Sequence, residues 1–177
     1  MLPEAHVFIA TSLDGFIADA SGGVDWLVSL PAPEGEDHGY GAFMEGIDCL
    51  LMGAGSYRSL LTFPEWLYDK PVFVLSHALA EADIPDRLKG RVRLLDLPPA
   101  EALAALGAQG VRRVYLDGGK VISSFLREGL VQRLIVTRVP VLLGRGLPLF
   151  HDTGPLRLRH VETRSWAHGF VQSTYSL

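Results

Sequence analysis

Hydrophobic and polar residues follow two different patterns along the chain. In the larger N-terminal part, short apolar runs rich in β-branched residues alternate with segments whose apolar residues recur at helical spacing. The runs predict buried strands at residues 6–12, 49–52, 71–76 and 114–117. The helical spacing predicts helices at residues 40–47, 56–61, 100–106 and 121–127.

The C-terminal part contains strand patterns without helices. Residues 130–141, 156–165 and 169–175 are rich in β-branched residues or alternate between apolar and polar side chains. No helix separates the last two, so they are expected to pair antiparallel. The whole pattern predicts a three-layer α/β fold, with a mainly parallel sheet and an antiparallel C-terminal hairpin. No linker or internal repeat divides residues 1–177, which are expected to form one domain.

Composition and charge narrow the class of partner. Of the 177 residues, 48% are hydrophobic and 20% are charged, which is typical of a globular chain. The 16 Lys and Arg residues are outnumbered by 20 Asp and Glu residues, giving a net charge of −4. Nucleic-acid binding requires a basic face, so we expect a small-molecule partner instead. No apolar stretch reaches the ~20 residues of a membrane span, and the N-terminus does not resemble a signal peptide, so we expect a cytoplasmic protein.

The single cysteine, Cys49, lies within an apolar run and is expected to be a buried structural thiol. The six histidines show no pair at metal-ligand spacing, and no metal site is expected.

Two glycine turns each lie between an apolar run and a predicted helix: Gly53-Ala54-Gly55-Ser56 and Gly118-Gly119-Lys120. Glycine at the carboxyl end of a strand lets the backbone approach a phosphate. Neither turn matches G-x-G-x-x-G, because Arg58 occupies the place of the third glycine. Each turn alone is equally explained as a tight connection. Together they favour a site for a pyrophosphate.

Ser76 and His77 end the third predicted strand at the same edge of the sheet. They are suited to hydrogen bonds with a further phosphate or ribose. A strand-end cap and a surface histidine are the structural alternative.

Several residues near the N-terminus are suited to substrate contact but have equally good structural explanations. Asp14 lies in an Asp-Gly turn, where no functional reason is needed. Asp37 precedes a predicted helix and is either its N-cap or a carboxylate that pairs with a bound heterocycle. Trp26 stacks on a ligand or simply packs.

The ordered set of motifs resembles the dihydrofolate-reductase-like family that contains the C-terminal reductase domain of the bifunctional riboflavin-biosynthesis protein. The resemblance is carried by SLDGFIA at 12–18, LMGAGSY at 51–57, VLS at 74–76, YLDGGK at 115–120, FLREGLV at 125–131 and PVLLGRGLPLF at 140–150. No deaminase half with a zinc signature is present. The resemblance spans nearly the whole chain and implies an eight-stranded, mainly parallel sheet.

The resemblance also implies NADPH as the cofactor. The residues it assigns to the cofactor are Gly53, Gly55, Ser56, Ser76, Gly118, Gly119 and Lys120. It places the loop after Asp14 and the helix region with Asp37 and Tyr40 around the substrate, with Asp37 orienting the substrate or assisting its protonation. Many relatives have an arginine where this chain has Ala54. Arg58, one helical turn further on, is our candidate for the replacement, and His77 is the alternative.

The sequence therefore predicts an NADPH-dependent reductase that transfers hydride to a small nitrogen heterocycle. A phosphoribosyl substrate of riboflavin synthesis would need Lys120, Arg138 or Arg145, whereas a pterin would need Asp37. The alternative is a catalytically inactive nucleotide-binding or dimeric scaffold module. A homodimer is expected from the family and from the long apolar run 131–150, part of which is available to pair with a second chain.

Overall fold

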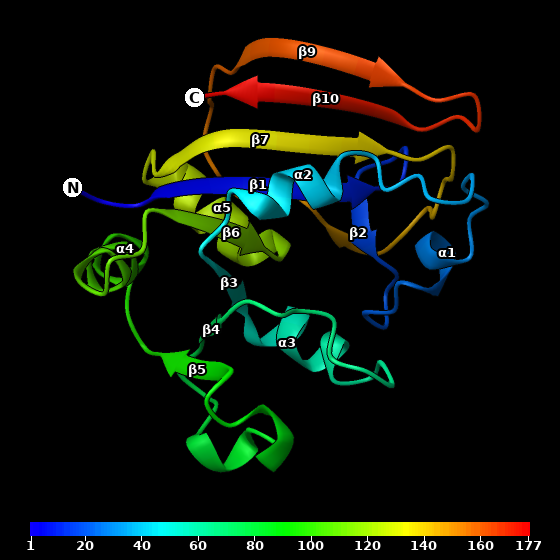
Figure 1. Ribbon diagram of the computed structural model, residues 1–177. Helices are drawn as coiled ribbons and strands as arrows, with labels where there is room; N and C mark the ends of the chain where they lie inside the picture. The colour runs from blue at the N-terminus through cyan, green and yellow to red at the C-terminus, as the bar shows by residue number, and fades with distance from the viewer.

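The computed structural model describes residues 1–177 and is built around one eight-stranded sheet (Figure 1). In sheet order the strands are β5 (Val92–Leu95), β4 (Val72–Leu75), β3 (Cys49–Gly53), β6 (Arg113–Asp117), β1 (Glu4–Thr11), β7 (Val131–Arg138), β10 (Val171–Ser176) and β9 (Arg159–Ser165). The pairs from β5 to β7 are parallel, and β10 pairs antiparallel with both β7 and β9. The predicted fold class, including the C-terminal hairpin, is confirmed.

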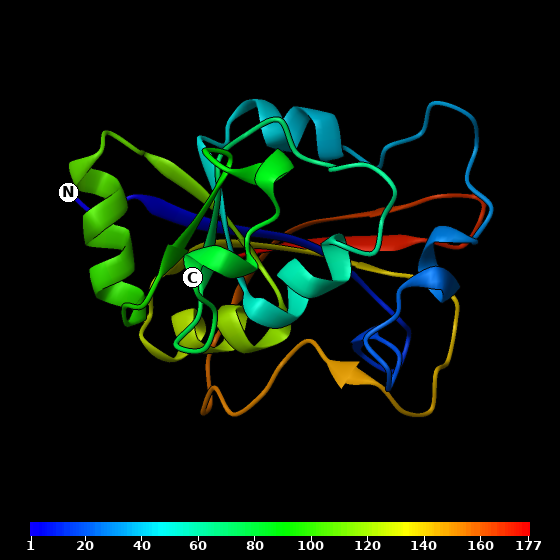
Figure 2. The same cartoon turned by 90° about the horizontal axis from the view of Figure 1, so that it is seen from below.

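Helices cover both faces of the parallel part of the sheet. The elements are α4 (Pro99–Ala108) and α5 (Gly119–Arg127) on one face, and α2 (Tyr40–Glu45), α3 (Ala54–Leu60) and the 3₁₀ turns η1 (Glu81–Asp83) and η2 (Asp86–Leu88) on the other. Figure 2 shows α2 and α5 on opposite sides of the sheet. Ile122 and Phe125 of α5 are fully buried, and Tyr57 of α3 is nearly so. Burial of such apolar faces on both sides of one sheet stabilises the three layers.

Several short elements were not predicted from the sequence, among them β5 and α1. β5 is a four-residue edge strand. Its VRLL sequence contains an arginine, so the apolar pattern that would predict a strand is weak. The helix α1 (Asp25–Val28) is a single turn inside the segment 20–37, which was expected to be a loop.

The apolar run 130–141 forms less strand than expected. β7 ends at Arg138, and Pro140 follows, which has no N–H for a ladder. Because β7 pairs with β1 on one edge and β10 on the other, its backbone is not available to a second chain. The expectation that this strand pairs with a twin chain is therefore wrong for residues 131–138. The open edge on this side of the sheet belongs to β9.

A small two-stranded ribbon stands beside the main sheet. It consists of β2 (Phe16–Ala18) and β8 (Leu147–Pro148), paired antiparallel. The Asp14 carboxylate fixes the loops that lead into it. It accepts hydrogen bonds from the Ser12 hydroxyl (2.6 Å), the Leu143 amide (3.2 Å) and the Gly144 amide (2.7 Å). These bonds hold the pKa of Asp14 below its usual value, with the Ser12 bond contributing most.

Cys49 lies in β3 and is 1% exposed, in agreement with the expected buried thiol. Burial raises its pKa to about 12. No helix in the structure is both long enough and apolar enough to cross a bilayer.

Candidate functional site

A cleft with two halves lies where the parallel strands end. The first half, here called the basic half, has a volume of about 880 Å³. The second, here called the apolar half, has a volume of about 700 Å³. Both halves are lined by Ile17, Gly55, Ser56, Arg58 and Leu147, so these residues form a shared wall. Ligand sites in open α/β sheets are found at this end of the strands.

The basic half brings together every residue that the sequence assigned to the cofactor. Gly53, Gly55, Ser56, Arg58, Ser76, His77, Gly118, Gly119 and Lys120 all line it. They come from the ends of β3, β4 and β6 and from the starts of α3 and α5. Parallel strands end at one edge of the sheet, which explains why sequence-distant turns meet here. Their role in binding a cofactor stays a prediction.

The charges around the basic half favour an anion. Arg58, Lys120, His77 and His151 line it, and no Asp or Glu does. His77 is hydrogen-bonded through Nδ1 to the Asp96 carboxylate, which lies outside the lining. The first turn of α5 adds backbone N–H groups and the positive end of a helix dipole. This donor set fits the phosphates of a dinucleotide.

The glycines of the two turns are required for different reasons. A Cβ on Gly119 would lie 2.5 Å from the Pro148 carbonyl oxygen, and Gly118 has a φ of 91°. Both positions therefore need glycine for the fold itself. A Cβ on Gly55 would meet no atom within 4 Å. Gly55 thus has no packing reason to be glycine, and its bare backbone leaves room at the junction of the two halves.

Ser76 also has a structural task. Its hydroxyl oxygen accepts hydrogen bonds from the Ala78 and Leu79 amides, each at 3.1 Å. The strand-end cap considered as an alternative is therefore present. The hydroxyl proton of Ser76 is not used by these bonds.

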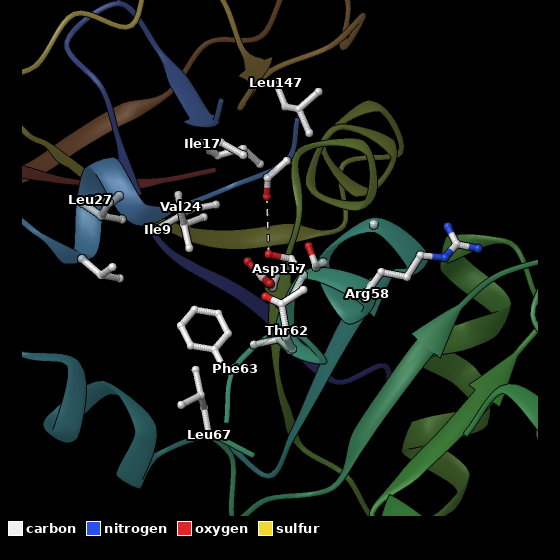
Figure 3. A pocket seen from close by; sticks show the side chains of 18 of the residues that line it. Ile9, Ile17, Val24, Leu27, Arg58, Thr62, Phe63, Leu67, Asp117 and Leu147 are labelled. Atoms are coloured by element: carbon white, nitrogen blue, oxygen red, sulfur yellow. Dashed lines mark hydrogen bonds between the residues drawn. The ribbon is translucent and has the colours of Figure 1, made fainter. Parts of the chain in front are cut away.

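The apolar half is lined mainly by aliphatic and aromatic side chains. Figure 3 shows Val24 and Leu27 on one side of the cavity, with Ile9 beside Val24, and Phe63 and Leu67 on the other side. Fifteen of its 23 lining residues are hydrophobic. A cavity of this kind binds flat apolar ligands, with few polar groups to fix their orientation.

Asp117 supplies the one carboxyl group of the apolar half. It is the last residue of β6, and burial raises its pKa. A hydrogen bond from the Gly118 amide and one from the Ser56 hydroxyl act in the opposite direction. Buried carboxyls with a raised pKa in a cleft are candidates for acid–base or hydrogen-bonding roles. Sequence reasoning missed Asp117, although a charged residue that ends a strand buried on both faces, directly before a glycine turn, was a usable signal.

Tyrosines surround this carboxyl group. The Tyr115 hydroxyl donates to the Phe8 carbonyl at 2.8 Å. Tyr40 lines the apolar half, as the sequence predicted for a substrate contact, and burial raises its pKa to about 12. Tyr40 therefore stays protonated at neutral pH.

The other predicted substrate residues lie elsewhere. The Asp14 carboxylate accepts hydrogen bonds from the Ser12 hydroxyl and the Gly144 amide within the loops, and Asp14 lines neither half. Asp37, the predicted catalytic residue, accepts bonds from the Gly39 and Gly41 amides at 2.8 Å each and caps the start of α2. It lines a smaller cavity of about 310 Å³, which adjoins the apolar half and shares Phe8, Ala10, Leu27, Val28 and Tyr40 with it. Both carboxylates thus have a structural role, and their roles toward a substrate stay predictions.

Trp26 and the expected phosphate donors are also placed differently. Trp26 lines neither half, and its buried indole N–H has no hydrogen-bond partner, so packing explains it better than ligand stacking. Of the three donors expected for a phosphoribosyl substrate, Lys120 lines the basic half. Arg138 and Arg145 line neither half.

Comparison with known proteins identifies the family. The family described as the RibD C-terminal domain matches residues 58–171. The chain belongs to this RibD C-terminal domain family. The uncharacterized protein YwjB of Bacillus subtilis is 31% identical over 175 residues, covering 96% of this chain and 95% of YwjB. The riboflavin biosynthesis protein RibD of Corynebacterium ammoniagenes is 32% identical over 156 residues, but the match covers 82% of this chain and only 45% of that protein.

Solved structures agree with this assignment. A putative riboflavin biosynthesis protein from Shewanella sp. PV-4 has a TM-score of 0.91 and 40% identity, with 99% of this chain and 98% of that chain covered. A deaminase/5-amino-6-(5-phosphoribosylamino)uracil reductase from Thermotoga maritima has a TM-score of 0.74, and 99% of this chain covers 56% of it. At 16% identity, the second likeness shows the shared fold.

Proposed function

We propose that this RibD C-terminal-type protein is an NADPH-dependent reductase of a small nitrogen heterocycle. The observation that carries the proposal is the joined cleft. A basic half without carboxylates meets an apolar half with one partly buried carboxyl, and Gly55 and Ser56 lie in their common wall. A dinucleotide in the first half and a flat ring in the second would place the two reactants next to each other.

The basic half offers a place for each part of the dinucleotide. Leu75, Leu95 and Leu97 form an apolar surface for the adenine beside Ser76 and His77. The turn Gly118-Gly119-Lys120 would hold the pyrophosphate at the first turn of α5. Arg58 is the arginine best placed to replace the one missing at Ala54 in contacting the 2′-phosphate.

The reduced dinucleotide, when bound, supplies a hydride. The hydride would go to the carbon of a C=N bond, and the nitrogen of that bond would take up a proton, so that the cofactor would leave in its oxidised form. The aliphatic walls of the apolar half exclude water from this step. Burial raises the pKa of Asp117, and this carboxyl is the one in the apolar half that can hydrogen-bond a ring nitrogen or exchange a proton with it.

Calorimetric titration with NADPH, NADP⁺ and NADH tests the first half of the proposal. Bound cofactor at 100 times its dissociation constant adds about 2.7 kcal/mol to the free energy of unfolding, and a thermal melt reports this independently. NADPH oxidation with aminopyrimidine and pterin substrates then tests the reaction. Absence of any cofactor binding at millimolar concentration would overturn the proposal.

A second candidate is a module that keeps the fold without catalysis, as a nucleotide-binding or dimeric scaffold. Ala54 favours it, since this position lines the basic half without the arginine found in many relatives. NADPH binding without oxidation of any heterocycle would support this candidate.

We also propose a homodimer that uses the free edge of β9. Strand β9 ends the sheet, and Val161 and Val171 on this hairpin are 50% and 42% exposed. The unpaired backbone of a strand edge can form hydrogen bonds with a second copy, although Val161 is the one apolar residue of β9. Light scattering of the protein and of Val161→Lys measures the mass directly, and a monomeric wild type would overturn this point.

A further inference from the structure

We infer that the substrate of this cleft is an uncharged heterocycle without a phosphate, in contrast to the phosphoribosyl compound named for the Thermotoga reductase. The inference rests on the proposed function, because it specifies which ring compound enters the apolar half. It follows from the charges, the hydroxyl groups and the rim of that half.

Positive charge is almost absent from the apolar half. Arg58 is its only basic lining residue, and this residue also belongs to the wall of the basic half. Figure 3 shows the Arg58 side chain extended away from Phe63 and Leu67. A phosphate placed among these apolar side chains would lose its hydration without gaining a partner, which is strongly unfavourable.

The hydroxyl groups of the apolar half do not replace the missing cations. The Ser21 hydroxyl donates to the Asp19 carboxylate at 2.6 Å, and the Thr62 hydroxyl donates to the Ser59 carbonyl at 2.7 Å. The Tyr115 hydroxyl donates to a backbone carbonyl, and the Ser56 hydroxyl bonds Asp117. Most of the hydroxyl protons are thus used inside the protein. Tyr40 and the wall shared with the basic half are the remaining donors, too few for the oxygens of a phosphate dianion.

The rim of the apolar half points to the same class of ligand. Val28, Leu67 and Leu147 line it and are 62%, 55% and 46% exposed. Exposed aliphatic groups around a cavity indicate contact with an apolar part of a ligand. A substituent that leaves the cavity would therefore meet aliphatic side chains before it reached solvent.

Asp117 provides recognition that suits an uncharged ring. An ionised carboxylate accepts hydrogen bonds from adjacent N–H and amino groups, and a protonated one pairs with adjacent ring N and N–H groups. Either form matches an edge of an aminopyrimidine or a pterin. A phosphate dianion has no N–H to donate and would be repelled by the ionised form.

Matched ligand pairs test the inference. For an aminopyrimidine riboside and for a pterin with a hydroxyalkyl side chain, the compound and its phosphate ester are titrated calorimetrically into the protein, with and without saturating NADP⁺. We expect the phosphate-free member of a pair to bind at least about 10-fold more tightly, and to show the higher kcat/KM with NADPH. Equal or tighter binding of the phosphate esters, or no binding by any phosphate-free member, would overturn the inference.

The arms of this experiment separate the two proposals. Titration with NADP⁺ alone decides whether the basic half takes the cofactor. The ligand pairs without NADP⁺ test the apolar half whether or not the cofactor binds. If the protein proves not to bind the cofactor, the ligand pairs still show whether the apolar half prefers compounds without a phosphate.

A substitution that adds a positive charge at the rim of the apolar half provides the second test. Leu67→Lys places an ammonium group at the exposed rim and should shift the binding ratio about 10-fold toward the phosphate ester. Leu158→Lys is the matched control, because Leu158 is 38% exposed and lines neither half. An unchanged ratio in Leu67→Lys would contradict the view that missing positive charge causes the preference.

Discussion

The basic half and the apolar half of the cleft share one wall but are built in different ways. The basic half is made largely of backbone turns at the ends of parallel strands, with cations around them. The apolar half combines side chains of β1 and β6 with side chains from the N-terminal loop, α1, α3 and the segment after α3. The first construction follows from the sheet itself, whereas the second depends partly on loops, which can change without changing the sheet. A family built in this way can keep one cofactor and change its substrate.

The largest expected effect is a loss of stability, and it tests the fold of the basic half independently of any ligand. Gly119→Ala places a Cβ against the carbonyl oxygens of Pro148 and Leu149, at 2.5 and 2.9 Å. Because both are backbone atoms, the ribbon strand β8 must move, at a cost of roughly 1–3 kcal/mol. Urea unfolding measures this loss. A variant as stable as the wild type would show that the contact is relieved without cost.

Arg58→Ala tests how the basic half distinguishes its cofactors. Loss of one charge-assisted contact to the 2′-phosphate, worth roughly 1.5–3 kcal/mol, should weaken NADPH binding about 10- to 100-fold and leave NADH binding unchanged. Arg145→Ala is the control, since Arg145 is exposed and lines neither half. Equal losses for both cofactors, or no loss, would rule out this role and leave His77 as the candidate.

Gly55→Ala should change stability and binding in opposite directions. The new Cβ meets no protein atom within 4 Å, and alanine favours the helix α3 by roughly 0.5 kcal/mol. The same methyl group narrows the junction of the two halves and should weaken NADP⁺ binding several-fold. Unfolding curves and titrations on one preparation check both results. Unchanged affinity would mean that the ligand does not approach Gly55.

The smallest expected effect concerns the carboxyl group of the apolar half. The pKa of Asp117 is raised in the folded protein, so the folded state holds its proton more tightly than the unfolded chain does. Stability is therefore lost as pH rises from about 4, the ordinary pKa of an aspartate, through the raised pKa. Asp117→Asn should remove this part of the pH dependence. Parallel stability curves for the two proteins between pH 4 and neutral pH would contradict the assignment.

The set of residues that lines the basic half was predictable because its signals are local. Gly53, Gly55, Gly118 and Gly119 each follow an apolar strand, and the topology of a parallel sheet brings such turns together. The same rule predicted that Ser76 and His77 lie at this edge, because they directly follow strand β4. The fold class was predictable for the same reason, although β5 was missed because it is only four residues long and Arg93 interrupts its apolar residues.

The apolar half was not predictable in this way. Aspartates in turns and before helices form hydrogen bonds with nearby amides, and this local use accounts for Asp14 and Asp37. The walls of the apolar half come from Phe63, Leu67 and the residues of α1, which carry no pattern that differs from ordinary core packing. Only the three-dimensional arrangement shows that they enclose a cavity.

The buried sulfhydryl of Cys49 has a practical consequence. A thiol with a pKa of about 12 and 1% exposure has almost no reactive thiolate at neutral pH. Alkylating reagents should therefore leave the native chain unmodified. A fluorophore or spin label attached through Val28→Cys or Leu67→Cys would then occupy a single known position at the entrance of the cleft, and its signal would report the arrival of each ligand separately.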